Sequence, residues 1–198
     1  MDMVKGKVVL ITGAGKGIGR KLAEELAARG AIIAANDISP INVDEVVAGI
    51  LAKGGQAKTY LEDVAKKVGA QMLAKSVEDD FGTIDILINH ASAEPRTPLL
   101  DMDEWDWHRT LDVNLTGAFL MSQTVGRVMK ANGSGVILSL LAGADEREKE
   151  AGAYLTSKAG LAEFCTQLAR ELSPHEVRVM SAANYEEALK KLEEACKS

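Results

Sequence analysis

The apolar residues in the first half of the chain form short continuous runs separated by amphipathic stretches. Runs rich in β-branched residues are typical of strands covered on both faces. We predict such strands at residues 7–12, 31–37, 57–61 (the weakest) and 84–89. Apolar positions at helical spacing predict helices at residues 20–29, 43–53 and 64–81. A glycine follows each of these helices, as is common where helices end.

The second half continues the alternation. A helical pattern at residues 103–129 is broken near residues 113–117, and a terminal amphipathic helix is predicted at residues 184–197. The remaining elements are strands at residues 135–141 and 177–181 and a helix at residues 154–172. Strands that alternate with helices of this length join by right-handed crossovers into a parallel sheet. We therefore predict a single α/β domain spanning residues 1–198, with a three-layer α/β/α doubly wound parallel sheet of about six strands.

The composition narrows the class of protein. The 198 residues are 46% hydrophobic and 26% charged, with a formal net charge of −6. These values exclude a disordered chain and argue against binding to nucleic acid or to an anionic membrane. The sequence has no apolar run of about 18 residues and no cleavable signal pattern. Because Cys165 and Cys196 make no metal-binding spacing, we expect a cytoplasmic protein without a metal site.

The first predicted strand leads into a glycine-rich segment, TGAGKGIG at residues 12–19, which opens the first helix. A dinucleotide-binding fingerprint needs this context. Gly13 permits a tight turn, Gly17 lets the backbone approach a pyrophosphate, and Gly19 lets helix and strand pack closely, while free N–H groups of the helix attract the phosphates. The alternative is a strand–helix turn that carries glycine for backbone reasons alone. The spacing favours a Rossmann-type cofactor site, with the candidate residues Thr12, Gly13, Gly15, Lys16, Gly17, Ile18 and Gly19.

Two charged residues bear on the choice of dinucleotide. Asp37 ends the second predicted strand, where a carboxylate can bind the ribose hydroxyls of NAD and repel the 2′-phosphate of NADP. Asp37 can instead be a turn or N-cap residue of the segment NDISP. Lys16 argues for NADP, because a cation in the phosphate loop can pair with a 2′-phosphate. We favour NAD and keep NADP as possible.

Five ordered motifs, including the glycine spacing, resemble the short-chain dehydrogenase/reductase family. The resemblance runs from about Gly6 to Val179. It implies that Asp63 and Val64 contact adenine and that Asn89 and Ala91, in NHAS, line the cofactor site. It also implies that the catalytic residues include Asn114 in VNLTGAF together with Tyr154 and Lys158 of the YxxxK motif. The chain is identified as a shortened and divergent member.

The chemistry of the YxxxK motif is intelligible from its residues. Tyr154 and Lys158 are one helical turn apart and share a face. An ammonium group beside a phenol favours the phenolate and lowers the pKa of tyrosine from about 10. Tyr154 can then serve as general acid in carbonyl reduction and as general base in alcohol oxidation. In the family, the lysine also holds the nicotinamide ribose and the asparagine positions a relay water. The alternative is an ordinary amphipathic pair on a surface helix.

The strand that leads to this motif lacks the serine that the family carries at its end. Alignment on Ala142-Gly143 puts Leu140 in that position, and alignment by distance from Tyr154 puts Leu141 there. Ser139 is the local hydroxyl and therefore a candidate catalytic residue. If Leu140 occupies the serine position, Ser139 points to the opposite face of the strand. If Leu141 does, Ser139 lies on the same face but about 7 Å further back along the strand. Of the two interpretations of Ser139, we favour an ordinary strand residue over a working catalytic group.

Three other features need an interpretation. His90 replaces the second asparagine of the family motif. It could contact the nicotinamide side of the site, but we favour a packed, hydrogen-bonded histidine. His108, beside two tryptophans, is expected on a surface and not in a metal site. The charged run DEREKE at residues 145–150 is interpreted as a solvated loop.

The segment after the last predicted strand also departs from the family pattern. Relatives continue with a Pro-Gly turn and a substrate-binding segment, whereas MSAA at residues 180–183 leads directly into the terminal helix. We expect a site that is open on the substrate side. Two functions follow. One is an NAD(P)-dependent oxidoreductase that interconverts a hydroxyl and a carbonyl on a small molecule. The other is a catalytically impaired dinucleotide-binding protein of the same fold, used in sensing or assembly.

The resemblance also implies self-association. Relatives form dimers and tetramers through the helices that carry the asparagine and the YxxxK motif, here residues 103–129 and 154–172. We predict a homodimer or homotetramer, most simply a two-fold dimer. The substrate class is a small alcohol or carbonyl compound, and nothing in the residues specifies it further.

Overall fold

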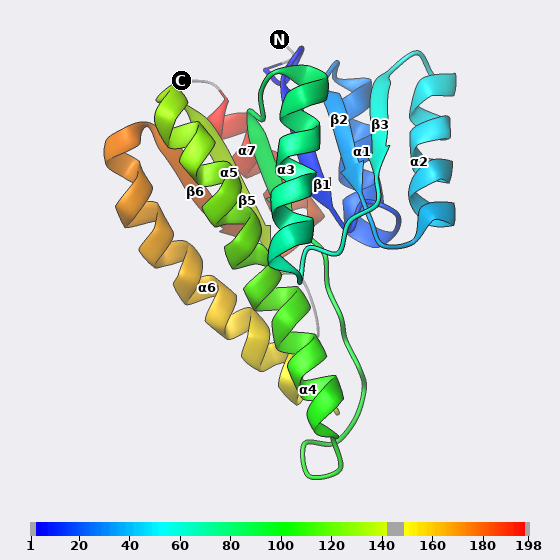
Figure 1. Cartoon of the computed structure of the whole chain (residues 1–198), viewed down its shortest axis with the longest axis vertical. Helices are drawn as coiled ribbons and strands as arrows, with labels where there is room; N and C mark the ends of the chain where they lie inside the picture. The colour runs from blue at the N-terminus through cyan, green and yellow to red at the C-terminus, as the bar shows by residue number, and fades with distance from the viewer. Residues whose placement is uncertain (1–2, 142–148, 197–198) are drawn as a thin grey trace.

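The computed structural model describes residues 3–141 and 149–196. Its centre is one parallel sheet of six strands in the order β3-β2-β1-β4-β5-β6 (Figure 1). The strands are β1 (Val8–Thr12), β2 (Ile32–Asn36), β3 (Gln56–Tyr60), β4 (Ile86–Asn89), β5 (Gly135–Leu140) and β6 (Val177–Ala182). The predicted doubly wound α/β fold is confirmed.

Helices cover both faces of the sheet. The face with α1 (Gly17–Ala28), α2 (Pro40–Ala52) and α7 (Tyr185–Ala195) is buried against one apolar cluster, and the face with α3 (Lys67–Phe81), α5 (Ala118–Asn132) and α6 (Gly152–Leu172) against another. Figure 1 shows α3 and α5 in front of the sheet and α1 and α7 behind it. A short 3-10 turn, Ser173–His175, joins α6 to β6.

The continuous apolar runs of the sequence become strands buried on both sides. All five residues of β1 are buried: Val8 and Leu10 face the α3 and α5 side, and Val9 and Ile11 face the α1 and α7 side. Successive strand residues point to opposite faces, so such a strand needs an apolar side chain at every position. This explains why KVVLIT shows no alternation of polar and apolar residues.

The predicted break near residues 113–117 is a π-helical turn. Residues 103–129 of the prediction resolve into α4 (Glu104–Leu111), the π-turn Asp112–Gly117 and α5, which follow one another without a loop. Single π-turns inside helices are frequent at functional sites. Gly117 fits here because a Cβ would lie 3.3 Å from two carbonyl oxygens, those of Asp112 and Val64.

Three predicted helix starts were wrong by three residues: that of α2, which begins at Pro40 and not at Val43, and those of α1 and α3. Helix α1 begins at Gly17 and not at Arg20, so the last two glycines of the loop form its first turn. Helix α3 begins at Lys67 and not at Val64. Asp63 explains the error at α3. Its side chain accepts a hydrogen bond from the Ala65 amide at 3.0 Å, and its carbonyl accepts one from the Lys66 amide, also at 3.0 Å. A turn of this kind competes with helix formation.

The sheet has a topological switch point. From β1 the chain builds β2 and β3 on one side, and then β4, β5 and β6 on the other. The connections leave β1 and β4 in opposite directions, which opens a crevice at their carboxyl ends. No helix in the described part of the chain is long and apolar enough to cross a membrane. Most of the predicted charged loop, residues 145–148, lies outside the described residues.

Candidate active site

A groove of about 980 Å³ opens at the carboxyl edge of the sheet, at the switch point. We call it the carboxyl-edge groove. Segments after β1, β2, β3, β4 and β6 line it, together with α4 and the start of α6. The sequence-predicted residues that line it are Gly13, Lys16, Gly17, Ile18, Asp37, Asp63, Val64, Ala91 and Tyr154.

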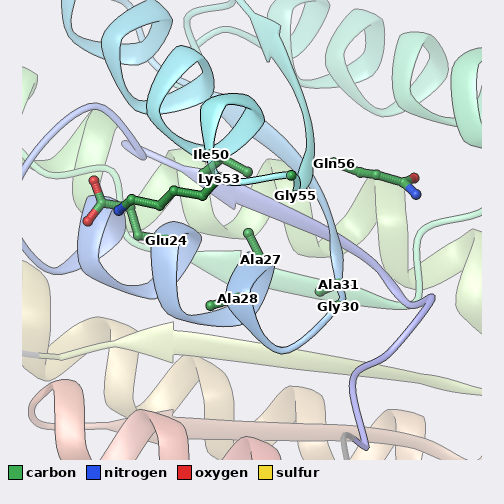
Figure 2. Close-up of a pocket in the computed structure, with 10 residues that line it drawn as sticks. Glu24, Ala27, Ala28, Gly30, Ala31, Ile50, Lys53, Gly55 and Gln56 are labelled. Carbon is green, nitrogen blue, oxygen red and sulfur yellow. The ribbon is translucent and has the colours of Figure 1, made fainter.

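A second hollow, of about 370 Å³, lies at the other edge of the sheet, where α1 and α2 end and β3 begins. Glu24 and Lys53 extend toward each other across it (Figure 2). Ligands of open α/β sheets bind at the carboxyl ends of the strands. We therefore assign the candidate site to the carboxyl-edge groove.

The glycine loop, residues 12–19, needs its glycines for conformation and for space. Gly13 and Gly17 have φ values of +67° and +58°, in the left-handed region that L side chains rarely adopt. A Cβ on Gly13 would lie 2.8 Å from the Ala91 Cα, and one on Gly19 would lie 2.5 Å from the Gly13 carbonyl oxygen. The loop thus packs against both the end of β4 and itself, and a side chain at either position would displace backbone.

The first turn of α1 points into the groove. Gly17 and Ile18 line the groove and are the first two residues of the helix, so their N–H groups have no intrahelical acceptor. Lys16, the N-cap residue, makes no side-chain cap. A helix start of this kind is an anion-binding arrangement. It fits the pyrophosphate of a dinucleotide.

Asp37 is both a turn residue and a groove residue. Its Oδ1 accepts the Ser39 N–H at 3.0 Å, as the turn interpretation expects, and its Oδ2 accepts the Gly15 N–H at 3.0 Å. A Cβ on Gly15 would lie 2.8 Å from that same Oδ2. The carboxylate therefore holds the glycine loop against the end of β2 and still lines the groove.

Asp63 and Val64 lie on the far side of the groove, after β3. The Asp63 carboxylate also bonds Arg109 of α4, at 3.4 Å. Arg109 lines the groove and was not predicted from the sequence. Its approach depends on where α4 crosses over the loop after β3, and no local motif signals that crossing.

Thr12 and Asn89 lie beneath the groove. The Thr12 hydroxyl oxygen accepts the amide N–H groups of His90 at 3.1 Å and Ala91 at 3.2 Å, which joins the ends of β1 and β4. The Asn89 side-chain amide donates to the Ser122 hydroxyl at 2.9 Å and to that of Ser139 at 3.4 Å. Both residues are buried, and they fix the strand ends from which the groove walls rise.

His90 is the packed histidine that we expected. Its ring nitrogens contact the Gly13 carbonyl oxygen at 3.0 Å and the Gly19 N–H at 3.2 Å. Burial lowers the pKa of His90 below its ordinary value of 6.5, and the nearby Lys158 ammonium lowers it further. The imidazole also borders the groove beside Ala91 and Ser92.

Tyr154 and Lys158 stand on the first two turns of α6. The Tyr154 side chain is 3% exposed and lines the groove. The Lys158 ammonium lies 5.4 Å from the centre of the Tyr154 ring and donates to the Leu140 carbonyl at 2.9 Å. Burial lowers the pKa of Lys158 to about 8, against an opposing effect of the Glu94 carboxylate. A buried ammonium thus stands beside a phenol at the groove.

Asn114, in the π-turn, fixes the segment that follows β4. Its side chain accepts the Ala93 N–H at 2.7 Å and donates to the Ala93 carbonyl at 3.0 Å and to the Ser157 hydroxyl at 2.9 Å. The next residue, Glu94, is thereby placed at the groove. Glu94 has no local sequence signal, because its position depends on the two hydrogen bonds between Asn114 and Ala93.

A small cavity of about 10 Å³ lies below the groove. Thr12, Asn89, Asn114 and Lys158 contribute to its lining. Asn89 Oδ1 is, among the described residues, the one buried side-chain nitrogen or oxygen atom without a hydrogen-bond partner. A polar space of this volume is about the size that one water occupies.

The end of β5 does not bring a hydroxyl to the groove. Ser139 is fully buried, and its neighbour Leu140 packs on the α1 and α7 side of the sheet. Leu141 packs on the other side, with Leu161 and Cys165 of α6. Ser139 shares the Leu141 face but does not line the groove. Ser139 thus lies outside the groove that Tyr154 lines.

The remaining histidine prediction concerns His108. It is exposed on α4 and contacts Glu104 of the same helix at 3.3 Å. No group of three or more potential metal ligands occurs among the residues that the structure describes.

Comparison with known proteins agrees with this geometry. The short chain dehydrogenase family matches residues 7–186. An uncharacterized oxidoreductase of Thermotoga maritima is 39% identical over an alignment 183 positions long, and the match covers 88% of this chain and 69% of that protein. A 3-oxoacyl-(acyl-carrier-protein) reductase of Synechocystis is 37% identical over 92% of this chain and 75% of its own length.

Solved structures give the same result. The NAD+-bound xylitol dehydrogenase has a TM-score of 0.86 at 33% identity, covering 91% of this chain and 70% of its own. A metagenomic short-chain oxidoreductase in complex with NADP has a TM-score of 0.92 at 27% identity, covering 99% of this chain and 93% of its own. The chain belongs to the short-chain dehydrogenase/reductase family.

Proposed function

We propose that the protein is an NAD(P)-dependent oxidoreductase that interconverts a hydroxyl and a carbonyl group on a small molecule. The observation that carries the proposal is the placement of Tyr154 at the groove with the Lys158 ammonium beside its ring. A dinucleotide, when bound, supplies or accepts the hydride. The chain's own residues bind it and move the proton.

The glycine loop fits a dinucleotide on structural grounds. Gly13 and Gly17 adopt the left-handed backbone conformation of a tight loop, and Gly17 and Ile18, whose N–H groups have no intrahelical acceptor, line the groove. We assign the pyrophosphate to these groups, adenine to Asp63 and Val64, and a ribose of the nicotinamide half to Lys158. Asn89 and Ala91, at the end of β4, support the groove wall between the pyrophosphate and the nicotinamide half.

We propose NAD as the preferred dinucleotide. The Asp37 carboxylate lines the groove at the end of β2, where it can accept hydrogen bonds from ribose hydroxyls and repel a 2′-phosphate. Lys16 acts in the opposite direction, and the solved relatives include one with NAD+ and one with NADP. NADP therefore remains the second choice.

Proton movement follows from the arrangement around Tyr154. Its hydroxyl gives a proton to the substrate oxygen in reduction and takes it back in oxidation. Lys158, held by the Leu140 carbonyl, stabilises the phenolate electrostatically. The small cavity next to Lys158 and Asn114 suits one water that passes the proton inward.

A second function is favoured by the end of β5. The position where relatives have a serine holds Leu140 or Leu141, depending on the alignment, and Ser139 is buried outside the groove. Loss of one hydrogen-bond donor to a reacting oxygen reduces rates by about 10²–10³. This supports a catalytically impaired dinucleotide-binding protein with a sensing or assembly role.

One experiment separates the two functions. Alcohols and carbonyl compounds are screened while the absorbance of reduced nicotinamide is followed. Turnover that Tyr154→Phe removes and Tyr60→Phe keeps supports the oxidoreductase, because Tyr60, on β3, lies outside the groove and its hydroxyl donates to Asp80 of α3. Saturable binding of NADH without turnover supports the impaired form. Failure to bind NAD(H) or NADP(H) refutes both.

We also propose that two copies associate through α5 and α6. Phe119 of α5, 40% exposed, meets Phe164 of α6 edge-to-face with ring centres 6.1 Å apart. A hollow of about 570 Å³ runs beside them between the two helices. Apolar groups on adjacent helices suit a two-fold interface. Light scattering at micromolar concentration should give a dimer or tetramer, and Phe164→Glu should give a monomer; a wild-type monomer contradicts the proposal.

A further inference from the structure

One imidazole joins the two ends of the glycine loop. His90 follows β4 directly, and its Nδ1 lies 3.0 Å from the Gly13 carbonyl oxygen while its Nε2 lies 3.2 Å from the Gly19 nitrogen. The fit is tight, because a Cβ on Gly19 would lie 2.5 Å from the imidazole Nδ1 and one on Gly13 would lie 3.1 Å from it. The ring therefore occupies the space that these glycines leave.

The two contacts select one protonation state. A carbonyl oxygen accepts, so Nδ1 must carry the hydrogen that faces Gly13. The Gly19 N–H donates, so Nε2 must hold a lone pair. Only the neutral ring with its hydrogen on Nδ1 satisfies both. A protonated ring would place a second N–H against the Gly19 N–H.

The contact to Gly19 also caps a helix from outside. Gly19 is the third residue of α1, and the N-cap residue Lys16 makes no side-chain cap. The His90 Nε2 takes the Gly19 N–H, whereas Gly17 and Ile18 line the groove. Of the three N–H groups in the first turn of α1, that of Gly19 is bonded to His90, and those of Gly17 and Ile18 are left for the phosphates.

We propose that neutral His90 is a positioning residue for the phosphate-binding loop and that its protonation weakens dinucleotide binding. The inference rests on the proposed function of the groove. His90 acts on dinucleotide binding through its contacts with the loop backbone at Gly13 and Gly19.

The charges around His90 set the direction of its titration. Burial disfavours the charged ring, and the Lys158 ammonium on α6 acts the same way. The Gly13 carbonyl and the Asp37 carboxylate at the end of β2 act in the opposite direction, but burial is the largest effect. Lys16, Glu94 and Tyr154 also line the groove around the ring. The pKa of His90 is therefore below 6.5, and the loop is held at neutral pH.

The first test needs no cofactor. Nitrogen-15 NMR of the imidazoles distinguishes the two neutral tautomers and follows each histidine through a pH titration. We expect His90 to carry its hydrogen on Nδ1 and to titrate below the ordinary histidine value of 6.5. A hydrogen on Nε2, or a titration at or above that value, would overturn the assignment.

The second test measures NAD+ affinity by calorimetry at about pH 7.5 and at the lower pH at which NMR shows His90 to be mostly protonated. Because one hydrogen bond is lost, we expect wild-type Kd to rise about fivefold at the lower pH. His90→Asn and His90→Gln cannot titrate, so their Kd should change less than about twofold. His108→Gln is the matched control and should keep the wild-type profile, because His108 pairs with Glu104 on the surface of α4.

The outcomes separate the two proposals. Equal pH profiles for wild type and a folded His90 variant would refute the coupling while the groove keeps its function. If wild type bound no dinucleotide at pH 7.5, the proposed function and the coupling would both fail, and the NMR result would still decide the state of the ring. If neither variant folds, the wild-type profile is compared with that of His108→Gln and with the NMR titration of His90. A drop in affinity that does not coincide with that titration overturns the coupling.

Discussion

The two ends of the carboxyl-edge groove are built differently. At the nucleotide end (the glycine loop, Asp37, Asp63 and Arg109), carboxylates and N–H groups hold one another, and most contacts involve backbone. At the proposed reaction end, Tyr154 lines the groove, the Lys158 ammonium is buried beside its ring, and leucines stand where β5 ends. We therefore expect binding to depend on backbone shape and reaction to depend on a few side chains that are costly to bury.

The largest expected effect is at Lys158. In Lys158→Met, turnover should fall by about 10³-fold or more, because the phenolate loses its cation. The variant should also be more stable, by about 1–2 kcal/mol at pH 7, because a buried charge whose pKa is depressed destabilises the folded state. Chemical denaturation measures this gain.

The stability gain has a defined pH dependence. Lys158 has a folded pKa of about 8 against an ordinary value of 10.5. Below pH 8 the charge is buried in the folded protein, and the destabilisation is fully present. As the pH rises from 8 toward 10.5, the folded protein holds a neutral amine, and the gap between wild type and variant should close. A gap that is constant over this range would contradict the assigned pKa.

A smaller effect is expected at the nucleotide end. Gly19→Ala places a Cβ 2.5 Å from the Gly13 oxygen and from the His90 ring, so the loop must move. Overpacking of about 1–3 kcal/mol corresponds to a Kd for NAD+ that is about 5- to 150-fold higher. Gly49→Ala is the control, because a Cβ there meets nothing within 4 Å. Equal affinities for the two variants would show that the loop is not the binding element.

Asp37 tests the choice of dinucleotide. Asp37→Ala removes the proposed ribose acceptor and also releases the Gly15 and Ser39 amides. We expect the Kd ratio of NADP+ to NAD+ to fall by about tenfold, because the charge that repels a 2′-phosphate is gone. Asp44→Ala, on α2 with its side chain bonded to Thr59, is the control. An unchanged ratio would mean that Asp37 serves the turn alone.

The smallest effect concerns the end of β5. Leu141→Ser puts a hydroxyl on the face that α6 covers, and kcat should rise about fivefold, well below the full value of such a donor. Leu140→Ser is the matched control, since Leu140 faces α1 and α7 and is 1% exposed. It should lower stability and leave kcat per folded molecule unchanged. If kcat rose in Leu140→Ser and not in Leu141→Ser, Leu140 and not Leu141 would occupy the position of the family's serine.

The same contrast explains what could be predicted from the sequence. The strands, the glycine loop and the Tyr154–Lys158 pair were found because each depends on local spacing or on a buried apolar run. The start of α1 was placed at Arg20 because glycine has low helix propensity, whereas the structure uses Gly17 and Gly19 as its first turn.

Other site residues have no local signal. Arg109 reaches the groove because α4 crosses the loop after β3, and Glu94 does so because Asn114 holds the preceding residue. The role of His90 depends on contacts to residues more than 70 positions earlier in the chain. Positions of this kind are set by tertiary packing, which a pattern of single residues does not contain.

The hydroxyl of Thr12 has a consequence for folding. It binds the amides of His90 and Ala91, which lie 78 and 79 residues away along the chain. Contacts of such long range form only after a large loop has closed, and they slow folding. The first three strands and their helices can therefore associate while the groove is still incomplete. Protection of the Ala91 amide from hydrogen exchange during refolding would mark the moment at which the two halves of the sheet join.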